Sequence, residues 1–434
     1  MTSNAEHGSS AGGLVVAKGS FAAMGGAERD LIRNLPAFAQ RFQVSVATLH
    51  SVPELESVCA RLGLPLISPD EAWETPTDAF STVLDSGKDA AAKAWGGCSG
   101  LAKTLAESEA VHLVSGDGSL ALLEHIPDSV AVHLHLLEPH RGLHEDVLHR
   151  QIDGSPKRSL GLTSALLSRA RRRDIGAIRI LSDRAQTAIS GNSSYTAARI
   201  GEVYGVDAGV LLPSVVSDEF PAESGSDEPS EPRAMTGPYV VSVGRASWVK
   251  GSWETVSMLS GSGVSLAHVG GGSPENLERL SQHAESCGVE LWVAPRLSSP
   301  EMAAVMRGAR AVVSMAHGEP FGLTPVEAIS VGTPALVVDE GGFRDTVVDG
   351  VNGCLLPRGD IGAWHSALEQ AADGATRAAW TEAGRARIAD MDLSPEAQCR
   401  RRESILHSLR ECDSMNTWPN HSNRSLLTSF HGRK

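Results

Sequence analysis

The sequence predicts an α/β protein built from two doubly wound domains in tandem. Short runs rich in Val, Leu and Ile alternate with longer amphipathic stretches, and this alternation is typical of parallel sheets covered by helices on both faces. An acidic segment rich in Pro, Ser and Gly interrupts the pattern once, and the alternation then begins again. At 434 residues, the chain is also longer than one ordinary hydrophobic core supports.

The apolar runs are the expected strands of each sheet. Between the runs 13–19 and 44–50, the stretch 27–42 has the periodicity of a helix. In doubly wound sheets, ligands bind beyond the carboxyl ends of the strands. Two facing sheets therefore predict one interdomain cleft. In the first half, strands are expected at 13–19, 44–50, 111–117 and 130–136, with IRILSD (178–183) and GVLLPS (209–214) extending the series. In the second half, they are expected at 239–246, 264–272, 289–295, 309–319 and 334–342.

The domain boundaries follow from the change in composition. The segment 217–238 is acidic and nearly free of bulky apolar residues, so it cannot form a core and is interpreted as a linker. Near the end of the chain, Ser394 can cap a helix that Pro395 begins. The predicted parts are an N-terminal domain (1–213, with 1–12 mobile), a linker (214–238), a C-terminal domain (239–393), a crossover helix (394–412) and a mobile tail (413–434).

Charge and cysteine content exclude several classes of protein. The formal net charge of −14 argues against general nucleic-acid binding, which needs Lys and Arg to neutralise phosphates. The six cysteines are scattered without zinc spacing, which suits reduced thiols in a cytoplasmic protein. The polar N-terminus lacks the layout of a signal peptide, and no apolar run approaches the length of a membrane span. Contact with a membrane is therefore expected only at its surface.

The stretch HGEPFGLTPVEAIS (317–330) places two carboxylates, Glu319 and Glu327, around a tight turn into a helix. One interpretation is structural: Thr324 is the N-cap, Pro325 is the first helical residue, and Glu327 completes a capping box. The other is chemical, because free amides at a helix N-terminus bind phosphate. The amides of Gly322, Leu323 and Thr324 would then face a diphosphate, and the two carboxylates would accept hydrogen bonds from sugar or ribose hydroxyls.

The segment EPFGLTPVE (319–327) resembles the E-x7-E signature of retaining glycosyltransferases of family 4, which have the GT-B architecture of two Rossmann-like domains. The resemblance implies that Glu319 contacts the transferred sugar and that Glu327 binds the ribose of the nucleotide. The following run, 328–357, is also similar to the family, except that Asp345 stands where a glutamate is usual.

Two further stretches carry candidate donor-binding residues. In VVSVGRASWVKG (240–251), a strand delivers Arg245 to its carboxyl end, with Lys250 five residues later. These cations are either a solvated pair or a grip on a leaving diphosphate, and they resemble the family's Arg/Lys pair. Gly25 and Gly26 follow the first strand, where they either form a tight turn or, as in the family's similar GGxE start, approach donor phosphates or the acceptor.

Other stretches support the same comparison. His133 and His135 alternate onto one face of a strand; a packed role is open for both, and the resemblance implies that a histidine near the strand end, best matched by His135, lies near the sugar. The segment VAPRL (293–297), with Arg296, is expected to border the base. Asn192 and Ser193 match the family's NS pair without an assigned chemistry. The basic cluster 168–174 is either a solvated helix face or a contact for an anionic acceptor or membrane.

The resemblance implies a retaining glycosyltransferase (a hexosyltransferase) that moves a sugar from a UDP- or GDP-type donor to an acceptor hydroxyl, with the donor on the C-terminal, donor-binding domain and the acceptor on the N-terminal, acceptor-side domain. No metal-binding pair of aspartates is found near a strand end, and Arg245, Lys250 and a helix N-terminus make a metal unnecessary. No cofactor is expected beyond the nucleotide sugar. A lipid-linked sugar, a polysaccharide and a small natural product are all compatible acceptors. The alternatives are a GT-B epimerase, which needs no acceptor, and a protein that binds nucleotide sugars without turnover.

Overall fold

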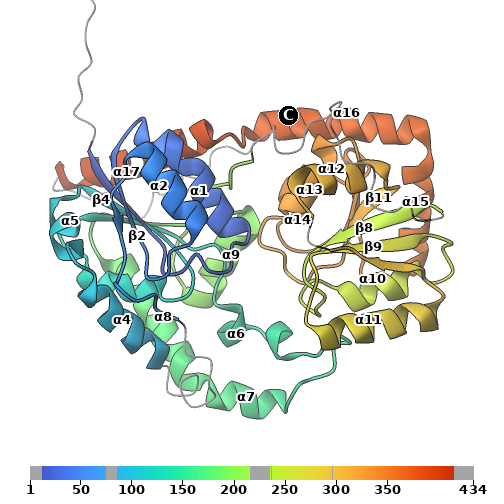
Figure 1. Ribbon diagram of the computed structural model, residues 1–434, viewed down its shortest axis with the longest axis horizontal. Coiled ribbons are helices and arrows are strands. Elements are labelled where there is room, and N and C mark those ends of the chain that lie inside the picture. The colour runs from blue at the N-terminus through green and yellow to red at the C-terminus, as the bar shows by residue number, and fades with distance from the viewer. Residues whose placement is uncertain (1–11, 75–85, 216–234, 236, 296, 415–434) are drawn as a thin grey trace, which may run out of the picture.

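The computed structural model describes residues 12–74, 86–215, 235, 237–295 and 297–414. Most of the predicted linker and tail, the start of the chain and Arg296 lie outside these residues. The described chain forms two sheets, each with every strand pair parallel. Figure 1 shows the two domains side by side, joined along one edge by the C-terminal helices and along the opposite edge by a segment that contains α6 and α7.

The first domain is a seven-stranded sheet in the order β3-β2-β1-β4-β5-β6-β7 among the described residues. Its strands are β1 (Gly13–Ala17), β2 (Gln43–Ala47), β3 (Leu66–Ile67), β4 (Ala110–Val114), β5 (Ala131–His135), β6 (Thr187–Gly191) and β7 (Gly209–Val210). Its helices are α1 (Gly26–Ala39), α2 (Pro53–Leu62), α4 (Ser86–Gly97), α5 (Leu101–Glu107), α6 (Arg141–His144), α7 (Leu160–Leu166), α8 (Ser168–Asp183) and α9 (Ser194–Tyr204), with short 3₁₀ turns η1 (Ser119–His125) and η2 (Val147–His149).

The second domain is a six-stranded sheet in the order β10-β9-β8-β11-β12-β13 among the described residues. Its strands are β8 (Tyr239–Val243), β9 (Ser265–Val269), β10 (Leu291–Val293), β11 (Ala311–Ser314), β12 (Ala335–Val338) and β13 (Gly353–Leu356). Its helices are α10 (Ser252–Leu259), α11 (Pro274–Cys287), α12 (Ser299–Gly308), α13 (Leu323–Ser330), α14 (Phe343–Thr346), α15 (Ile361–Ala372) and α16 (Gly374–Met391), and α17 (Pro395–Ser414) ends the described chain.

Most expected strands are present, but the run IRILSD (178–183) was wrongly expected to be a strand. It forms the end of helix α8, in which Ile178 and Leu181 are buried and Ile180 is 75% exposed. A short apolar run does not distinguish a buried strand from one face of a helix. The strand at this position is β6, nine residues after Ile178, and the sequence also did not reveal the strands β3 and β13.

The C-terminal helix α17 crosses back to the first domain, as the Ser394 and Pro395 signals indicate. The Ser394 hydroxyl accepts a hydrogen bond from the amide of Ala397 at 3.1 Å. Cys399 and Leu406 of α17 belong to the core of the first domain. Arg402 is 1% exposed and its guanidinium lies 4.3 Å from the centre of the Phe38 ring, an attractive cation–π geometry. The helix therefore closes the first domain although it follows the second in sequence.

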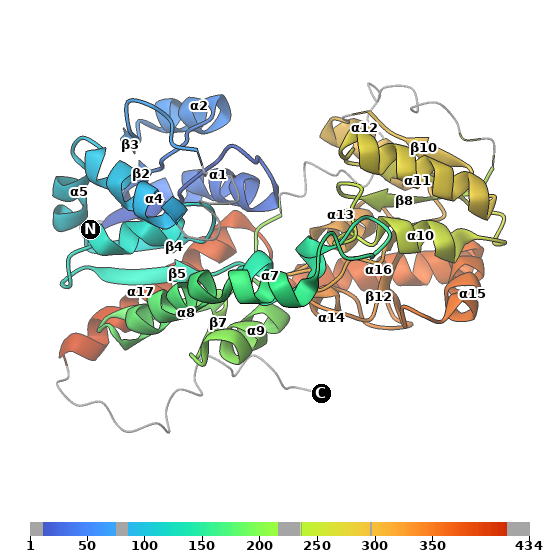
Figure 2. The same cartoon turned by 90° about the horizontal axis from the view of Figure 1, so that it is seen from below.

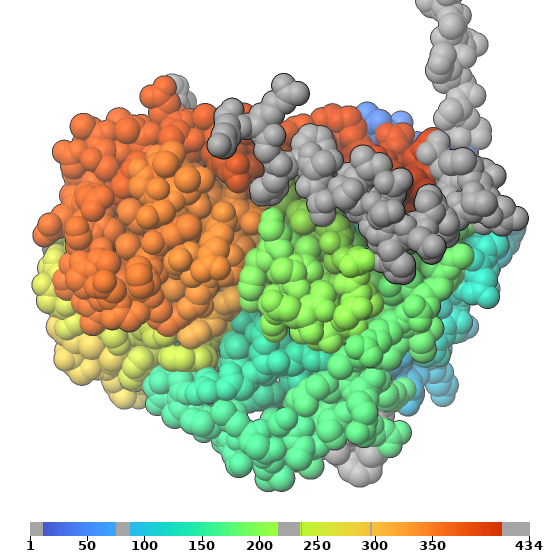
Figure 3. Space-filling view, turned by 180° about the vertical axis from the view of Figure 1, so that it is seen from behind, coloured from blue at the N-terminus to red at the C-terminus, as the bar shows by residue number. Residues whose placement is uncertain are grey.

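A strap of residues 146–158 makes a second connection, from the first domain to the second. Figures 1 and 2 show α6 and α7, the two helices that flank the strap, near the domain boundary. Figure 3 shows the molecule from behind in a space-filling view. Ile152 is 1% exposed inside the hydrophobic core of the second domain. Asp153 forms an ion pair with Arg279 of α11 at 2.6 Å, so the strap is held by both apolar and charged contacts.

Removing the Ile152 side chain should destabilise the second domain. Ile152→Ala leaves a cavity in a packed core, and such truncations cost about 2–4 kcal/mol. Urea unfolding followed by tryptophan fluorescence should show a lower midpoint. Ile180→Ala is the matched control because Ile180 is 75% exposed, and its midpoint should shift little. Equal shifts for the two variants would contradict the insertion of Ile152 into the core.

Candidate functional site

The predicted cation and carboxylate meet at the carboxyl edge of the second sheet. β8 ends at Val243, and the loop that follows returns Lys250 to the end of the neighbouring strand β11. The Lys250 ammonium donates a hydrogen bond to the Glu319 carboxylate at 2.7 Å. Both side chains are partly exposed, Lys250 at 35% and Glu319 at 20%. The pair therefore offers one cation and one carboxylate at the place where doubly wound folds bind ligands.

Glycines make this loop possible. Gly251 has φ of +63°, and a Cβ added there would lie 2.0 Å from the Met315 carbonyl oxygen. Gly244 has φ of +139°, and a Cβ there would press against the Lys250 side chain at 3.0 Å. The loop thus packs its backbone directly on the strand end that precedes Glu319.

The turn 315–322, which carries Glu319, is fixed by backbone and side-chain hydrogen bonds. The amide of His317 donates to the Val249 carbonyl at 2.9 Å, and the amide of Gly342 donates to the Glu319 carbonyl at 2.7 Å. The His317 ring stacks on Trp248 with centroids 4.5 Å apart. These contacts hold Glu319 in a defined place beside Lys250.

A second set of contacts comes from Arg358, which follows β13. Its guanidinium donates to the carbonyls of Met315 at 2.6 Å and Ala316 at 3.3 Å. Arg358 also forms ion pairs with Glu254 at 3.1 Å and Glu340 at 2.7 Å. Sequence reasoning missed this network, because its members are separated by up to 104 positions and match no local motif.

The helix after the turn begins earlier than expected, so the predicted capping box is wrong. The N-cap of α13 is Gly322, with φ of +88°, and Leu323 is the first helical residue. Thr324 and Glu327 therefore lie inside the helix. Gly322 has a packing reason as well, because a Cβ there would lie 2.6 Å from the Phe343 ring. The first amides of α13, including those of Leu323 and Thr324, lack partners within the helix, as in any helix start.

Of the other predicted donor-binding residues, the structure describes Arg245 and Glu327 but not Arg296. The Arg245 side chain is exposed at the end of β8 and forms no ion pair with the described residues. Glu327 is half-buried on α13, one turn after its start. Arg296 lies outside the described residues. The roles of these three side chains in donor binding remain predictions.

On the first domain, Gly25 and Gly26 begin α1 directly opposite the second domain. A Cβ added at Gly26 would lie 3.4 Å from the Leu323 side chain, so the two predicted loops meet across the domain boundary. The amide of Gly25 already donates to the Glu28 carboxylate at 2.8 Å. Glu28 is buried and pairs with the buried Lys18 at 3.2 Å. The capping glutamate of this site is therefore Glu28 on α1.

The predicted histidines lie in a buried cluster. The Nδ1 atoms of His112 and His133 are 3.1 Å apart. The Ser190 hydroxyl bridges His133 Nε2 at 2.8 Å and His135 Nδ1 at 3.0 Å. Burial, with the nearby Arg402 guanidinium, lowers the pKa of all three histidines, that of His135 to about 3. His135 is thus neutral and 2% exposed, and its contact with the sugar stays a prediction.

Within the NS pair, Ser193 connects the two domains. Ser193 is the N-cap of α9 and accepts from the Thr196 amide at 2.9 Å, while its hydroxyl donates to the Pro320 carbonyl beside Glu319. The amide of Ser194 donates to the Asp345 carboxylate at 2.6 Å. Asp345 therefore has an interdomain contact at the start of α9.

The basic cluster 168–174 forms the start of α8. Arg171 donates to the Leu143 carbonyl at 2.8 Å, and Arg173 pairs with Asp89 at 2.6 Å. Asp174 is a hydrogen-bond partner of both the His144 ring and the Tyr204 hydroxyl. Part of the cluster is therefore structural, while Arg169 and Arg172 are exposed. A contact of these two with an anionic acceptor or a membrane remains a prediction.

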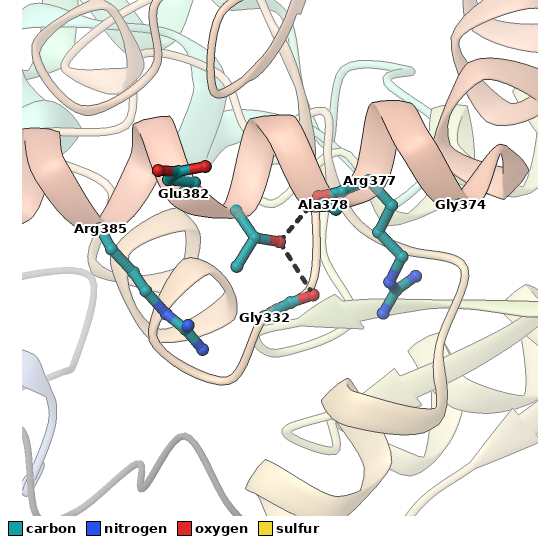
Figure 4. A pocket seen from close by; sticks show the side chains of 7 residues that line it. Gly332, Gly374, Arg377, Ala378, Glu382 and Arg385 are labelled. Atoms are coloured by element: carbon teal, nitrogen blue, oxygen red, sulfur yellow. Dashed lines mark hydrogen bonds between the residues drawn. The ribbon is translucent and has the colours of Figure 1, made fainter.

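Several features lie apart from this site. Within the described residues, no three His, Cys, Asp or Glu side chains are grouped so as to hold a metal ion, and no helix there has the length and apolar character of a membrane span. A shallow hollow lies on α16, where the Thr381 hydroxyl donates to the Arg377 carbonyl at 2.9 Å and to the Gly332 carbonyl at 3.3 Å (Figure 4). The bond to Gly332 fastens α16 to the turn after α13, whereas the bond to Arg377 lies within α16.

Comparison with known proteins agrees with this architecture. Residues 225–387, which include most of the second domain, match the family model of glycosyl transferases group 1. The chain superposes on sucrose-phosphate synthase from Thermosynechococcus elongatus with a TM-score of 0.66 and 16% identity, covering 92% of this chain and 100% of that one. It superposes on Anabaena HepE, solved with UDP and glucose, with a TM-score of 0.60 and 16% identity over 92% and 100%. The protein has the predicted GT-B fold.

Among curated proteins, the chain is 32% identical over 170 residues to a D-inositol 3-phosphate glycosyltransferase from Xylanimonas cellulosilytica. A protein of the same description from Mycobacterium tuberculosis (strain ATCC 25177 / H37Ra) is 34% identical over 112 residues. The matches cover 38% and 25% of this chain, and 40% and 21% of those relatives, so each spans less than half of either protein.

The contact between Gly251 and Met315 generates a first prediction for this site. Gly251→Ala should cost more than the 1–2 kcal/mol of a left-handed alanine, because its Cβ also meets the Met315 carbonyl at 2.0 Å. Gly261→Ala is the matched control, with φ of +75° and open space around the added carbon. Thermal unfolding of both variants measures the difference. Equal losses would show that the loop does not pack on the strand end.

The buried histidines generate a second prediction, on acid stability. Below about pH 6.5 the unfolded chain binds protons on these rings while the folded chain does not. The free energy of unfolding should therefore fall as the pH is lowered, by up to about 1.4 kcal/mol per pH unit for each histidine. Urea unfolding at pH 7.5, 6.5 and 5.5 measures the slope, and His133→Gln should make it shallower. An identical slope in that variant would contradict a neutral cluster.

Proposed function

We propose that the protein is a retaining glycosyltransferase that moves a sugar from a nucleotide diphosphate donor to an acceptor hydroxyl. The observation that carries the proposal is the Lys250–Glu319 pair, held at 2.7 Å at the carboxyl edge of the second sheet. A cation suits the departing diphosphate, where negative charge develops in the transition state. A carboxylate suits the hydroxyls of the transferred sugar, which donate hydrogen bonds.

The donor would lie on the second domain. Lys250 and Arg245 would neutralise the diphosphate together with the unpartnered amides at the start of α13. Glu319 would orient the sugar, and Glu327 would accept hydrogen bonds from the ribose. The match of residues 225–387 to glycosyl transferases group 1 supports this assignment, as does the fold shared with HepE, which was solved with UDP and glucose.

In the proposed reaction, the bond between the anomeric carbon and the donor phosphate oxygen breaks, and the acceptor oxygen attacks from the same face. The acceptor proton passes to an oxygen of the departing phosphate, so no separate protein base or nucleophile is required. Charge on the diphosphate would be met by Lys250, Arg245 and helix amides, so metal-independent transfer is part of the proposal. The fixed turn 315–322 would keep Glu319 oriented throughout.

Nucleotide binding tests the donor site. Wild type should be stabilised against thermal unfolding by one of UDP, GDP, ADP or TDP in EDTA, by about 2.7 kcal/mol at 100 times the dissociation constant. Glu327→Gln and Lys250→Ala should reduce the shift, because they remove a hydroxyl contact and a diphosphate contact. Glu382→Gln, an exposed glutamate on α16, should keep it. No shift with any nucleotide would overturn the donor site.

Turnover then separates the transferase from its alternatives. Product analysis with the sugar nucleotide of the preferred base should show retained anomeric configuration and, for Lys250→Ala, a loss of about 100-fold or more in kcat. An altered sugar nucleotide without an acceptor would instead indicate an epimerase. Binding without any turnover would indicate a non-catalytic protein.

A further inference from the structure

The turn after β5 carries a carboxylate that has no assigned role. β5 ends at His135, in the centre of the first sheet, and the segment LLEPHR (136–141) continues beyond its carboxyl edge. Pro139 is buried, and a residue that precedes proline is restricted to extended conformations. Glu138 is that residue. It therefore projects from the edge of the first sheet at a defined point of the backbone.

The surroundings of Glu138 come from both domains. Its nearest cation is Arg141, whose Nε lies 3.8 Å from the carboxylate. Glu319 and Lys250 of the second domain, and Glu145 directly after α6, also act electrostatically on Glu138. Burial, together with Glu319 and Glu145, raises the pKa of Glu138 to about 7 against the opposing effect of Arg141 and Lys250. Because Arg141 also donates to the His317 carbonyl, two residues before Glu319, the Glu138 carboxylate lies near the turn of the second domain that carries Glu319.

Arg141 pairs with this carboxylate at 3.8 Å but donates its hydrogen bonds to other groups. Its Nε donates to Glu145 at 2.9 Å, and its Nη2 donates to the His317 carbonyl of the second domain at 2.6 Å. Among the described residues, none donates a hydrogen bond to the Glu138 carboxylate, which is 42% exposed. Arg141 therefore sets the position of the turn relative to Glu319, and Glu138 keeps its acceptor capacity for another donor.

We propose that Glu138 is an acceptor-binding residue, whose carboxylate accepts a hydrogen bond from a hydroxyl of the acceptor beside the Lys250–Glu319 pair. This inference rests on the proposed glycosyl transfer, with the donor sugar on the second domain and the acceptor on the first. Glu319 would then contact the transferred sugar, and Glu138 would contact the acceptor, a sugar or a polyol, on the other side of the new bond.

The charges around Glu138 indicate an uncharged ligand at this point. Three carboxylates, Glu138, Glu145 and Glu319, lie near the two cations Arg141 and Lys250, and the further cation Arg199 is shared between Glu145 and a fourth carboxylate, Glu202. A phosphate would meet an excess of negative charge, while Lys250 is committed to Glu319 and the donor. A hydroxyl donates a hydrogen bond without adding charge. The group that binds Glu138 is therefore a hydroxyl of a neutral polyol or sugar unit, even if the acceptor carries charge elsewhere.

Steady-state kinetics of Glu138→Gln and Glu138→Asp test the assignment. The donor is the sugar nucleotide whose base stabilises the wild type. The acceptor probe is the best substrate among glycerol, myo-inositol, glucose and trehalose. If the enzyme accepts none of these four, the rate of donor hydrolysis by water is measured. Glu138→Gln should raise the acceptor KM, or lower the rate of hydrolysis, by about 10- to 100-fold, as expected for a lost charged hydrogen bond. Glu138→Asp should recover part of the loss.

The pH dependence adds a readout that a structural role would not affect. In the wild type, kcat/KM for the acceptor should fall below about pH 7 as Glu138 is protonated, and the glutamine variant should lose this inflection. The nucleotide-induced thermal shift should stay unchanged. Glu382→Gln is the control, because Glu382 is exposed on α16 of the second domain; its kinetics should equal those of the wild type.

The outcomes separate this inference from the proposed function. An unchanged acceptor KM and pH profile in Glu138→Gln would overturn the role of Glu138 while leaving the transferase intact. A loss of nucleotide binding or of thermal stability in that variant would also overturn it, in favour of a structural role. Absence of nucleotide binding and turnover in the wild type would remove the proposed function, and the acceptor role with it.

Discussion

The turn 315–322 is the constraint on which the rest of the structure depends. Its backbone lies outside the regular hydrogen bonding of helix and strand, yet polar groups in a packed protein need partners. The partners come from both domains: Arg358 and Gly342 from the second, and Arg141 and Ser193 from the first. These bonds converge on a few neighbouring carbonyls of the turn. The position of Glu319 therefore depends on how the two domains pack together.

The connections between the domains are unusually well distributed along the chain. The strap places Ile152 in the second core, while α17 returns Cys399 and Leu406 to the first. A small apolar cluster of Phe321, Val326, Met391 and Leu393 lies beneath the turn that starts α13. Each hydrophobic core thus contains side chains from a segment that is contiguous in sequence with the other domain. Burial of their apolar surface stabilises the relative placement of the two domains as well as their separate folds.

Charge is used differently in the two halves of the site. In the first domain, Lys18 is buried and neutralised by Glu28, and Arg402 lies over an aromatic ring. In the second, Lys250 is partly exposed and Arg245 is exposed at the carboxyl edge of the sheet. A buried charge needs its partner permanently, whereas an accessible cation can exchange a solvated or paired state for an anionic ligand. This difference favours the second domain as the donor side.

Much of the fold could be predicted from the sequence, because hydrophobic periodicity and helix signals are local. The alternation of strands and helices, the break in composition before Tyr239 and the Ser394–Pro395 start of α17 are all of this kind. The pairing of Lys250 with Glu319 was also within reach, since both follow strands that end at the same sheet edge. The run at Ile178 was mistaken for a strand because a few apolar residues fit either period.

Only the tertiary structure decided the contacts between residues that are distant in sequence. The N-cap of α13 is Gly322 instead of Thr324, and Phe343 occupies the space that a side chain at Gly322 would need, a contact that no local pattern records. Arg358, Ile152 and Glu138 carry no motif, and their roles arise from neighbours that the other domain supplies. The sequence by itself determined the elements and the charged groups at strand ends, since these depend on nearby residues. The tertiary structure decided which of those groups face one another, since that depends on how two cores pack together.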